Sequence, residues 1–184
     1  MHLSGKQALR EQYRRERHER FFQESWQHIL VSSEFIGANK IASYLSYGEE
    51  PETSDLHSQL LGMGKKLYLP RLLADNDLEW VGWHGDASEL KVNGKIKEPI
   101  GPAISAEEFA DIEIMIVPAL HVDRDGNRLG QGGGSYDRAL ARSSAWKIAL
   151  VHYGEITSEK VPVEVHDQPV NAAATPDLLI RFVR

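Results

Sequence analysis

The sequence has no cysteine among its 184 residues. Disulfide bonds, thiolate metal ligands and cysteine nucleophiles are therefore excluded. The sequence also lacks a run of about 20 apolar residues, which is the length needed to span a bilayer. Its first 20 residues lack the apolar core of a secretion signal. We therefore expect a soluble, cytoplasmic protein with no membrane partner.

The chain also has no excess of basic residues. It contains 21 Lys and Arg and 27 Asp and Glu, which gives a net charge of −6. This acidic balance argues against a general nucleic-acid binder. Apolar residues make up 41% of the chain and charged residues 26%, which is typical of a globular protein rather than a disordered one. The length predicts a single domain over residues 1–184, and we expect a monomer.

Basic residues are nevertheless concentrated at the N-terminus. Residues 1–20 carry six Lys or Arg against three Glu, so that segment is positive while the rest of the chain is strongly negative. On a helix the spacing of Lys6, Arg10, Arg14 and Arg17 forms a single stripe. Such runs are usually solvated faces, but a basic arm that meets nucleic acid or a nucleotide phosphate is the alternative.

Apolar stretches predict strands over residues 40–47, 66–73, 78–83, 112–117, 146–153 and 178–183. Helical patterns cover residues 1–20, 53–64, 106–109 and 135–142, and residues 84–104 and 121–134 are expected to be loops. This alternation predicts an α/β fold in three layers: a mostly parallel sheet with helices on both faces, preceded by the basic helix. Ligands of such folds collect at the carboxyl ends of the strands, here residues 47–52, 69–71, 118–137 and 151–154.

A Gly-rich loop is the strongest local signal. Gly130 and the run 132–134 lie between an expected strand and an expected helix. Glycine lets the backbone approach a ligand closely, successive N–H groups can enclose an anion, and a following helix adds its own N–H groups. The alternative is a flexible surface turn. Ordering three consecutive glycines has a large entropic cost, and a simple turn could be built from other residues at a lower cost. We therefore favour a phosphate site over a surface turn.

Known motifs do not describe this loop. No Lys follows the glycines as a Walker loop requires, and Ser135 stands where a dinucleotide fingerprint needs its last glycine. Asp123 and Asp125 resemble the start of a calcium loop, but the glycine and glutamate that ligation needs further along are missing. Ser135 is also not in the GxSxG context of a hydrolase nucleophile.

The segment 127–138, NRLGQGGGSYDR, resembles the NRLGRGGGYYDR signature of the 5-formyltetrahydrofolate cyclo-ligases, also called methenyltetrahydrofolate synthetases. Further matches follow the family's order along the chain. They are Lys6 and Arg10 in KxxLR, the acidic segment 47–53, LPR at 69–71, KEP at 97–99, VPA at 117–119, and HD at 166–167 with VN at 170–171.

The resemblance implies a ligase of folate and one-carbon metabolism, with 5-formyltetrahydrofolate as its small-molecule substrate and ATP and Mg²⁺ as cofactors. In this reaction the formyl oxygen is phosphorylated, N10 of the folate closes the ring, and phosphate departs to leave 5,10-methenyltetrahydrofolate. Phosphoryl transfer needs positioning and charge neutralisation rather than a protein nucleophile, so the absence of cysteine is no obstacle.

Roles carry over from the family residue by residue. The residues implied to be catalytic, nearest the transferring phosphoryl group, are Gly132, Gly133, Gly134 and Tyr136. The residues implied to bind ATP are Lys6, Arg10, Arg128, Leu129, Gly130, Gln131, Gly132, Gly133, Gly134, Ser135 and Tyr136. Tyr47, Glu52, Gln131 and Ser135 are implied to bind the folate, and Asp137 and Asp167 to bind Mg²⁺. Trp83 either packs on the folate or belongs to the core, and Arg14, Arg15 and Arg17 are expected to be solvated.

Three positions depart from the family pattern. Gln131 replaces an arginine, Ser135 replaces a tyrosine, and Asn171 replaces an aspartate. The first change removes a cation beside the phosphates, where charge-assisted hydrogen bonds are strong. Together the three changes leave open the alternative of a non-catalytic or altered-specificity protein of the same fold that binds nucleotide or folate. An RNA-associated module built on the basic helix is a further alternative, which the net charge of −6 disfavours.

Overall fold

The computed structural model describes residues 5–20 and 22–183, so residues 1–4 of the expected basic helix lie outside the described residues. The α-helices are α1 (Gly5–Arg20), α2 (Ser33–Gly37), α3 (Ser54–Gly62), α4 (Ala106–Ala110) and α5 (Ser135–Ala141), with 3₁₀ helices η1 (Gln27–Val31) and η2 (Ala87–Glu89). The strands are β1 (Lys40–Ala42), β2 (Lys66–Leu72), β3 (Leu78–Trp83), β4 (Leu90–Asn93), β5 (Ile96–Pro99), β6 (Ile114–Pro118), β7 (His121–Asp123), β8 (Arg128–Leu129), β9 (Trp146–Leu150), β10 (Ile156–Thr157), β11 (Ala172–Ala174) and β12 (Leu179–Arg181).

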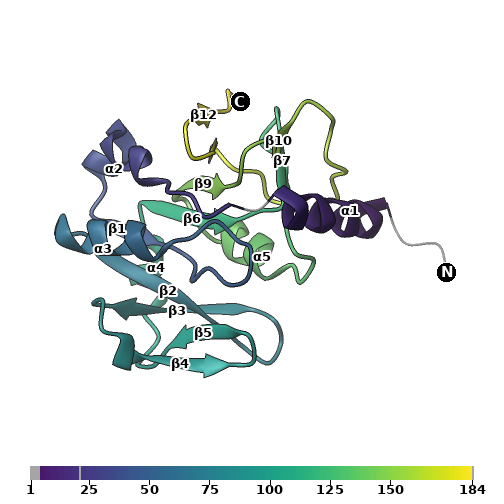
Figure 1. Cartoon of the computed structure of the whole chain (residues 1–184). Helices are drawn as coiled ribbons and strands as arrows, with labels where there is room; N and C mark the ends of the chain where they lie inside the picture. The colour runs from purple at the N-terminus through teal and green to yellow at the C-terminus, as the bar shows by residue number, and fades with distance from the viewer. Residues whose placement is uncertain (1–4, 21, 184) are drawn as a thin grey trace.

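A seven-stranded sheet in the order β12-β11-β9-β6-β1-β2-β3 forms the centre of the molecule (Figure 1). The five inner strands are parallel, and the two edge strands β3 and β12 are antiparallel to their neighbours. From β1 the chain crosses over to β2 on one side, and it later returns to place β6 on the other side. The point between β1 and β6 is thus where the strand order changes direction, the usual ligand position of such folds.

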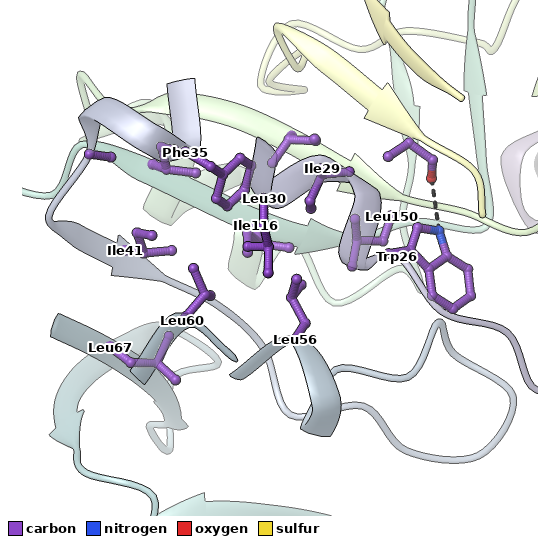
Figure 2. Packing of buried hydrophobic residues seen from close by; sticks show 14 of the residues in the cluster. Trp26, Ile29, Leu30, Phe35, Ile41, Leu56, Leu60, Leu67, Ile116 and Leu150 are labelled. Carbon is purple, nitrogen blue, oxygen red and sulfur yellow. Dashed lines mark hydrogen bonds between the residues drawn. The ribbon is translucent and has the colours of Figure 1, made fainter. Parts of the chain in front are cut away.

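Both faces of this sheet are buried, which confirms the predicted three-layer α/β fold. On one face Ile41 and Ile116 pack with Phe35 of α2 and Leu60 of α3, as Figure 2 shows. The alternate residues of the same strands pack on the other face, where the cluster includes Leu140 of α5. A strand buried on both faces is apolar along its whole length, which explains the continuous apolar runs of the sequence.

Several predicted strands are shorter in the structure than in the sequence analysis, including the last one, which covers only Leu179–Arg181 of the expected 178–183. The strand expected over residues 40–47 ends at Ala42. After Ala42 the chain leaves the sheet and is held by hydrogen bonds from side chains. The hydroxyl of Tyr44 donates to the Pro51 carbonyl at 2.8 Å, and the hydroxyl of Thr53 donates to the Tyr44 carbonyl at 3.0 Å. The strand expected over 146–153 likewise ends at Leu150.

The two expected loops contain strands. Residues 84–104 hold η2 and the antiparallel β4–β5 hairpin. Residues 121–134 hold β7 and β8, which form a second, three-stranded sheet with β10. Strand β11 was not predicted because its three alanines lack the β-branched and aromatic residues that indicate strands. No helix in the described part of the chain is long and apolar enough to cross a membrane.

Candidate active site

A cavity of about 370 Å³ opens at the carboxyl ends of β1, β2 and β6. The residues that line it are Lys6, Arg10, Tyr44, Leu45, Tyr47, Glu50, Pro70, Leu72, Leu78, Ile96, Lys97, Glu98, Pro118, residues 128–137, Glu164, His166 and Asp167. The cavity adjoins the point between β1 and β6 at which the strand order changes direction. All the predicted site residues except Glu52 line it, although they come from both ends of the sequence.

The Gly-rich loop forms one side of the cavity, and its glycines are required by close contacts. A Cβ atom on Gly130 would lie 2.6 Å from Nη1 of Arg128, and one on Gly132 would lie 3.4 Å from Cζ of Arg10. Gly132 and Gly134 also have positive φ angles of 112° and 69°. Because side chains rarely adopt such angles, the loop needs glycine at these two positions.

Helix α1 brings two of its cations, Lys6 and Arg10, to the cavity. Nε of Arg10 donates to the Gly130 carbonyl at 3.0 Å. Nζ of Lys6 is buried and donates to the Asp167 carboxylate, with Glu164 3.5 Å away. We call Lys6, Arg10, Arg128 and residues 130–134 the cationic wall of the cavity.

A buried ion pair holds α1 in this position. Nε and Nη2 of Arg17 donate to the Glu155 carboxylate at 2.8 and 2.7 Å, and Nη2 also donates to the Ala119 carbonyl at 2.6 Å. Nearby, Tyr13 stacks on His121 with 3.5 Å between the ring centroids. The expectation of a solvated Arg17 is therefore wrong, whereas Arg15 is exposed as expected.

Arg128 is buried beneath the loop. Its Nη2 donates to Asp137 at 3.0 Å and its Nη1 to the Pro118 carbonyl at 3.2 Å, while its Nε has no hydrogen-bond partner among the described residues. A buried cation with an unused donor fits an anionic ligand, because unpaired buried donors are costly.

Asp137 and Asp167 are the carboxylates that were expected to bind a metal. Asp137 pairs with Arg128, and Asp167 pairs with Lys6. Burial alone would raise the pKa of Asp167, but the hydrogen bond and charge of Lys6 hold it below its usual value. The described residues contain no cluster of three His, Cys, Asp or Glu that could hold a metal. One or two carboxylates together with ligand phosphates nevertheless suffice for Mg²⁺, so this donor set fits that ion.

Another part of the cavity lining is acidic and aromatic. We call Tyr44, Tyr47 and Glu50, with Pro70 and Leu72 beside them, the acidic wall. Glu50 is buried, and the backbone N–H of Tyr47 donates to its Oε2 at 3.2 Å. Burial raises the pKa of Glu50 to about 7, although Tyr47, Arg17 and Gln131 each act in the opposite direction.

The sequence analysis missed Glu50 and selected Glu52 instead. Oε1 of Glu52 accepts from the backbone N–H groups of Thr53 at 2.7 Å and Ser54 at 2.8 Å, so this carboxylate is engaged at the start of α3. Glu52 as a folate ligand stays a prediction, and the cavity wall carries Glu50. The signal was present, because both glutamates belong to the same acidic segment of the family pattern.

Other expected positions lie away from the cavity. Nε1 of Trp83 donates to the Asp86 carbonyl at 2.9 Å, and residues 151–154 do not line the site. Oδ1 of Asn171 accepts from the backbone of Lys147 at 2.8 Å, a bond that the family's aspartate could also accept. The β4–β5 hairpin, expected to be loop, adds Ile96 and Lys97 to the lining.

A cavity at the carboxyl ends of parallel strands, with a Gly-rich loop and converging cations, defines an α/β protein with a candidate ligand site in the position usual for such folds. The model of the 5-formyltetrahydrofolate cyclo-ligase family matches residues 5–176. A 5-formyltetrahydrofolate cyclo-ligase of Mycolicibacterium smegmatis is 35% identical over 150 residues, which cover 77% of this chain and 75% of that protein. The Escherichia coli protein of the same name is 36% identical over 146 residues, covering 77% of this chain and 80% of its own.

A solved structure agrees with the sequence matches. The NMR structure of the Aquifex aeolicus 5,10-methenyltetrahydrofolate synthetase has a TM-score of 0.79 and 26% identity to this chain, and covers 96% of this chain and 92% of its own. The chain belongs to the 5-formyltetrahydrofolate cyclo-ligase family, and it is an enzyme. The resemblance noted in the sequence is thereby confirmed.

Proposed function

We propose that this enzyme converts 5-formyltetrahydrofolate to 5,10-methenyltetrahydrofolate in a reaction that depends on ATP and Mg²⁺. The observation that carries the proposal is that one cavity joins a cationic, Gly-rich wall to an acidic, aromatic wall. A triphosphate and a pterin differ in the same way, since one is polyanionic and the other is flat and rich in N–H donors. When bound, ATP supplies the phosphoryl group that makes the formyl oxygen a leaving group.

The cationic wall is suited to the phosphates. Lys6, Arg10 and Arg128 neutralise negative charge, and the backbone N–H groups of residues 132–134 donate to oxygens on the transferring group. Such groups accelerate phosphoryl transfer by positioning and electrostatic stabilisation, without a covalent step on the protein. The unpartnered Nε of Arg128 is a donor that such a ligand can use.

Asp137 and Asp167 would hold the Mg²⁺ ion, which neutralises phosphate charge when bound. Their present partners are the cations Arg128 and Lys6. These ion pairs support the proposal, because carboxylates and cations gathered at one place can exchange partners when phosphates and a divalent ion arrive together.

The acidic wall is suited to the folate. A Glu50 carboxylate with a pKa of about 7 is partly ionised at neutral pH, and it can accept hydrogen bonds from pterin N–H groups. Tyr47, which is 37% exposed, supplies aromatic surface for the rings beside it. N10 of the folate closes the ring while these side chains hold the pterin in place.

The direct test is to mix purified protein with 5-formyltetrahydrofolate, ATP and Mg²⁺ and to follow the methenyl product by absorbance and ADP by chromatography. We expect one ADP per methenyl product and no product without ATP. Binding of both ligands with no turnover would instead indicate the non-catalytic alternative, which the changes at 131 and 135 motivate. The RNA alternative has lost support, since Arg10, Arg14 and Arg17 all bond within the chain.

A further inference from the structure

The Gly-rich loop has little support from its own backbone. In the segment 130–134 every residue except Gln131 is glycine. Residues 130–133 form no backbone–backbone hydrogen bond with any other described residue. Glycine loses more conformational freedom on ordering than any other residue, so a segment of this composition is costly to hold in one shape. The bonds that fix the loop must therefore come from side chains elsewhere in the molecule.

Helix α1 supplies these bonds. Nε of Arg10 donates to the Gly130 carbonyl at 3.0 Å. One turn further along the helix, Nε of Arg14 donates to Oε1 of Gln131 at 3.0 Å, and Nη2 of Arg14 donates to the Gln131 carbonyl at 2.9 Å. Arg14 thus binds both the backbone and the side chain of one loop residue, directly before the three consecutive glycines.

Arg14 was expected to be solvated, and it is exposed but not unpaired. Its two donors belong to one planar guanidinium group, so the two bonds fix the orientation of the loop as well as its distance from α1. Arg15, the next residue of the helix, is also exposed and forms no hydrogen bond with the described part of the chain. The two neighbouring arginines therefore differ in one respect, which is the contact with the loop.

The residue at position 131 suits this arrangement. The family signature has arginine there, and a second guanidinium could not accept a hydrogen bond from Arg14 and would repel it. The amide oxygen of Gln131 accepts that bond. The departure from the signature therefore removes a cation from the loop and pairs the loop with a cation of α1 instead.

We propose that Arg14 is a positioning residue that, through Gln131, holds the Gly-rich loop against α1 in the conformation that receives phosphate. Arg14 does not line the cavity, whereas Gln131 and the glycines after it do, so Arg14 acts on a ligand only through the loop. A loop that is ordered in advance lowers the entropic cost of binding. That the ligand is a nucleotide phosphate rests on the proposed function, whereas the attachment of the loop is a property of the ligand-free protein.

Nitrogen-15 relaxation in the ligand-free protein tests the attachment. Arginine Nε–H groups give their own NMR signals, so Arg14 and Arg15 can be compared in one spectrum once Arg14→Lys has assigned the first. We expect an order parameter near that of the backbone for Nε of Arg14 and one below about 0.6 for Nε of Arg15. The order parameters of the amides of residues 131–133 should fall in Arg14→Met and stay constant in the matched control Arg15→Met.

Two results of this NMR experiment would overturn the proposal, whether or not the enzyme cyclises folate. One is equal mobility of the two arginine side chains. The other is a set of loop amides whose order parameters do not respond to Arg14→Met, or respond equally to Arg15→Met.

A kinetic test separates positioning from charge. Arg14→Met should raise the KM for ATP about five-fold and leave the KM for the folate and the melting temperature nearly unchanged, because Arg14 is exposed and lies outside the cavity. Arg14→Lys keeps the charge but loses the planar pair of donors, so it should restore only part of the loss.

Full restoration by lysine would show that charge alone acts, and an unchanged KM for ATP in Arg14→Met would show that the loop does not need Arg14. Either result contradicts the positioning role. An unmodified enzyme without turnover would instead contradict the proposed function, and the same variants would then be compared by calorimetric titration with ATP.

Discussion

The two walls of the cavity are built in opposite ways. The cationic wall combines residues far apart in the sequence, and its cations Lys6 and Arg128 are paired with Asp167 and Asp137. The polar side chains of the acidic wall, Tyr44, Tyr47 and Glu50, instead lie in one short segment after β1. Within the described residues Glu50 forms no salt bridge, and its pKa is raised to about 7. The cationic wall is therefore stabilised by its ion pairs, whereas the acidic wall holds a carboxyl group whose ionisation is disfavoured by burial.

This difference indicates how each wall can be broken. Lys6 and Arg10 of the cationic wall reach the cavity only while α1 is docked, so substitutions far from the cavity can remove them. The acidic wall is held by backbone turns and bonds such as that of Thr53 to the Tyr44 carbonyl. Substitutions there should change ligand binding and leave the rest of the fold intact.

The largest expected effect is on the anchor of the cationic wall. Arg17→Met leaves the buried Glu155 carboxylate without its partner, which should lower the free energy of unfolding by about 3–5 kcal/mol. Urea denaturation measures this directly. Because two apolar residues pack without an orphaned charge, the double variant Arg17→Met with Glu155→Met should recover much of the loss. A loss below about 1 kcal/mol for the single variant would show that the pair does not anchor α1.

The acidic wall should respond with the opposite sign. A carboxyl group whose pKa is raised in the folded state favours folding at low pH and disfavours it as the pH rises from its ordinary value through its folded value. Glu50→Gln should therefore stabilise the protein by up to about 3 kcal/mol at pH 8 and give no gain at pH 4. Thermal melts at the two pH values test this.

The same Glu50→Gln variant should bind the folate more weakly and ATP unchanged, since only the acidic wall is altered. Calorimetric titration with each ligand separates these effects. Destabilisation at pH 8, or equal weakening for both ligands, would contradict the assignment of Glu50 to an unfavourable charge on the folate side.

A smaller effect is expected from the loop backbone. Gly132→Ala introduces a side chain at a φ of 112° and against Arg10. The strain of holding the loop in its active conformation should be about 2 kcal/mol, which corresponds to a loss of about thirty-fold in kcat/KM for ATP. Gly133→Ala is the matched control, because its Cβ would meet only Ser135 Oγ at an ordinary 3.6 Å. If the two variants lost activity equally, the positive φ of Gly132 would not be the cause.

The smallest of these effects is expected from a single cation of the wall. Lys6→Met removes one charge-assisted hydrogen bond, so the KM for ATP should rise about ten-fold while the KM for the folate stays nearly constant. Lys160→Met, at an exposed lysine outside the cavity, is the control. A larger rise in the KM for the folate than for ATP would contradict the placement of Lys6 on the phosphate side of the cavity.

The sequence predicted the layered α/β fold because continuous apolar runs such as 112–117 have few other solutions. It also predicted the residues of the cationic wall, because a Gly-rich loop and regularly spaced cations indicate a phosphate site by residue type alone. It could not separate Glu50 from Glu52, because the choice depends on how the chain turns after Ala42. It also missed the burial of Arg17, whose partner Glu155 lies 138 residues further along.

The most direct test of the two-wall account compares Lys6→Met and Glu50→Gln in one cyclisation assay that records the methenyl product and ADP together. The account predicts that the unmodified enzyme forms both in equal amounts, that Lys6→Met raises the KM for ATP alone, and that Glu50→Gln raises the KM for the folate alone. Product formation without ADP, or a change of both constants in each variant, would contradict a cavity divided into a phosphate side and a folate side.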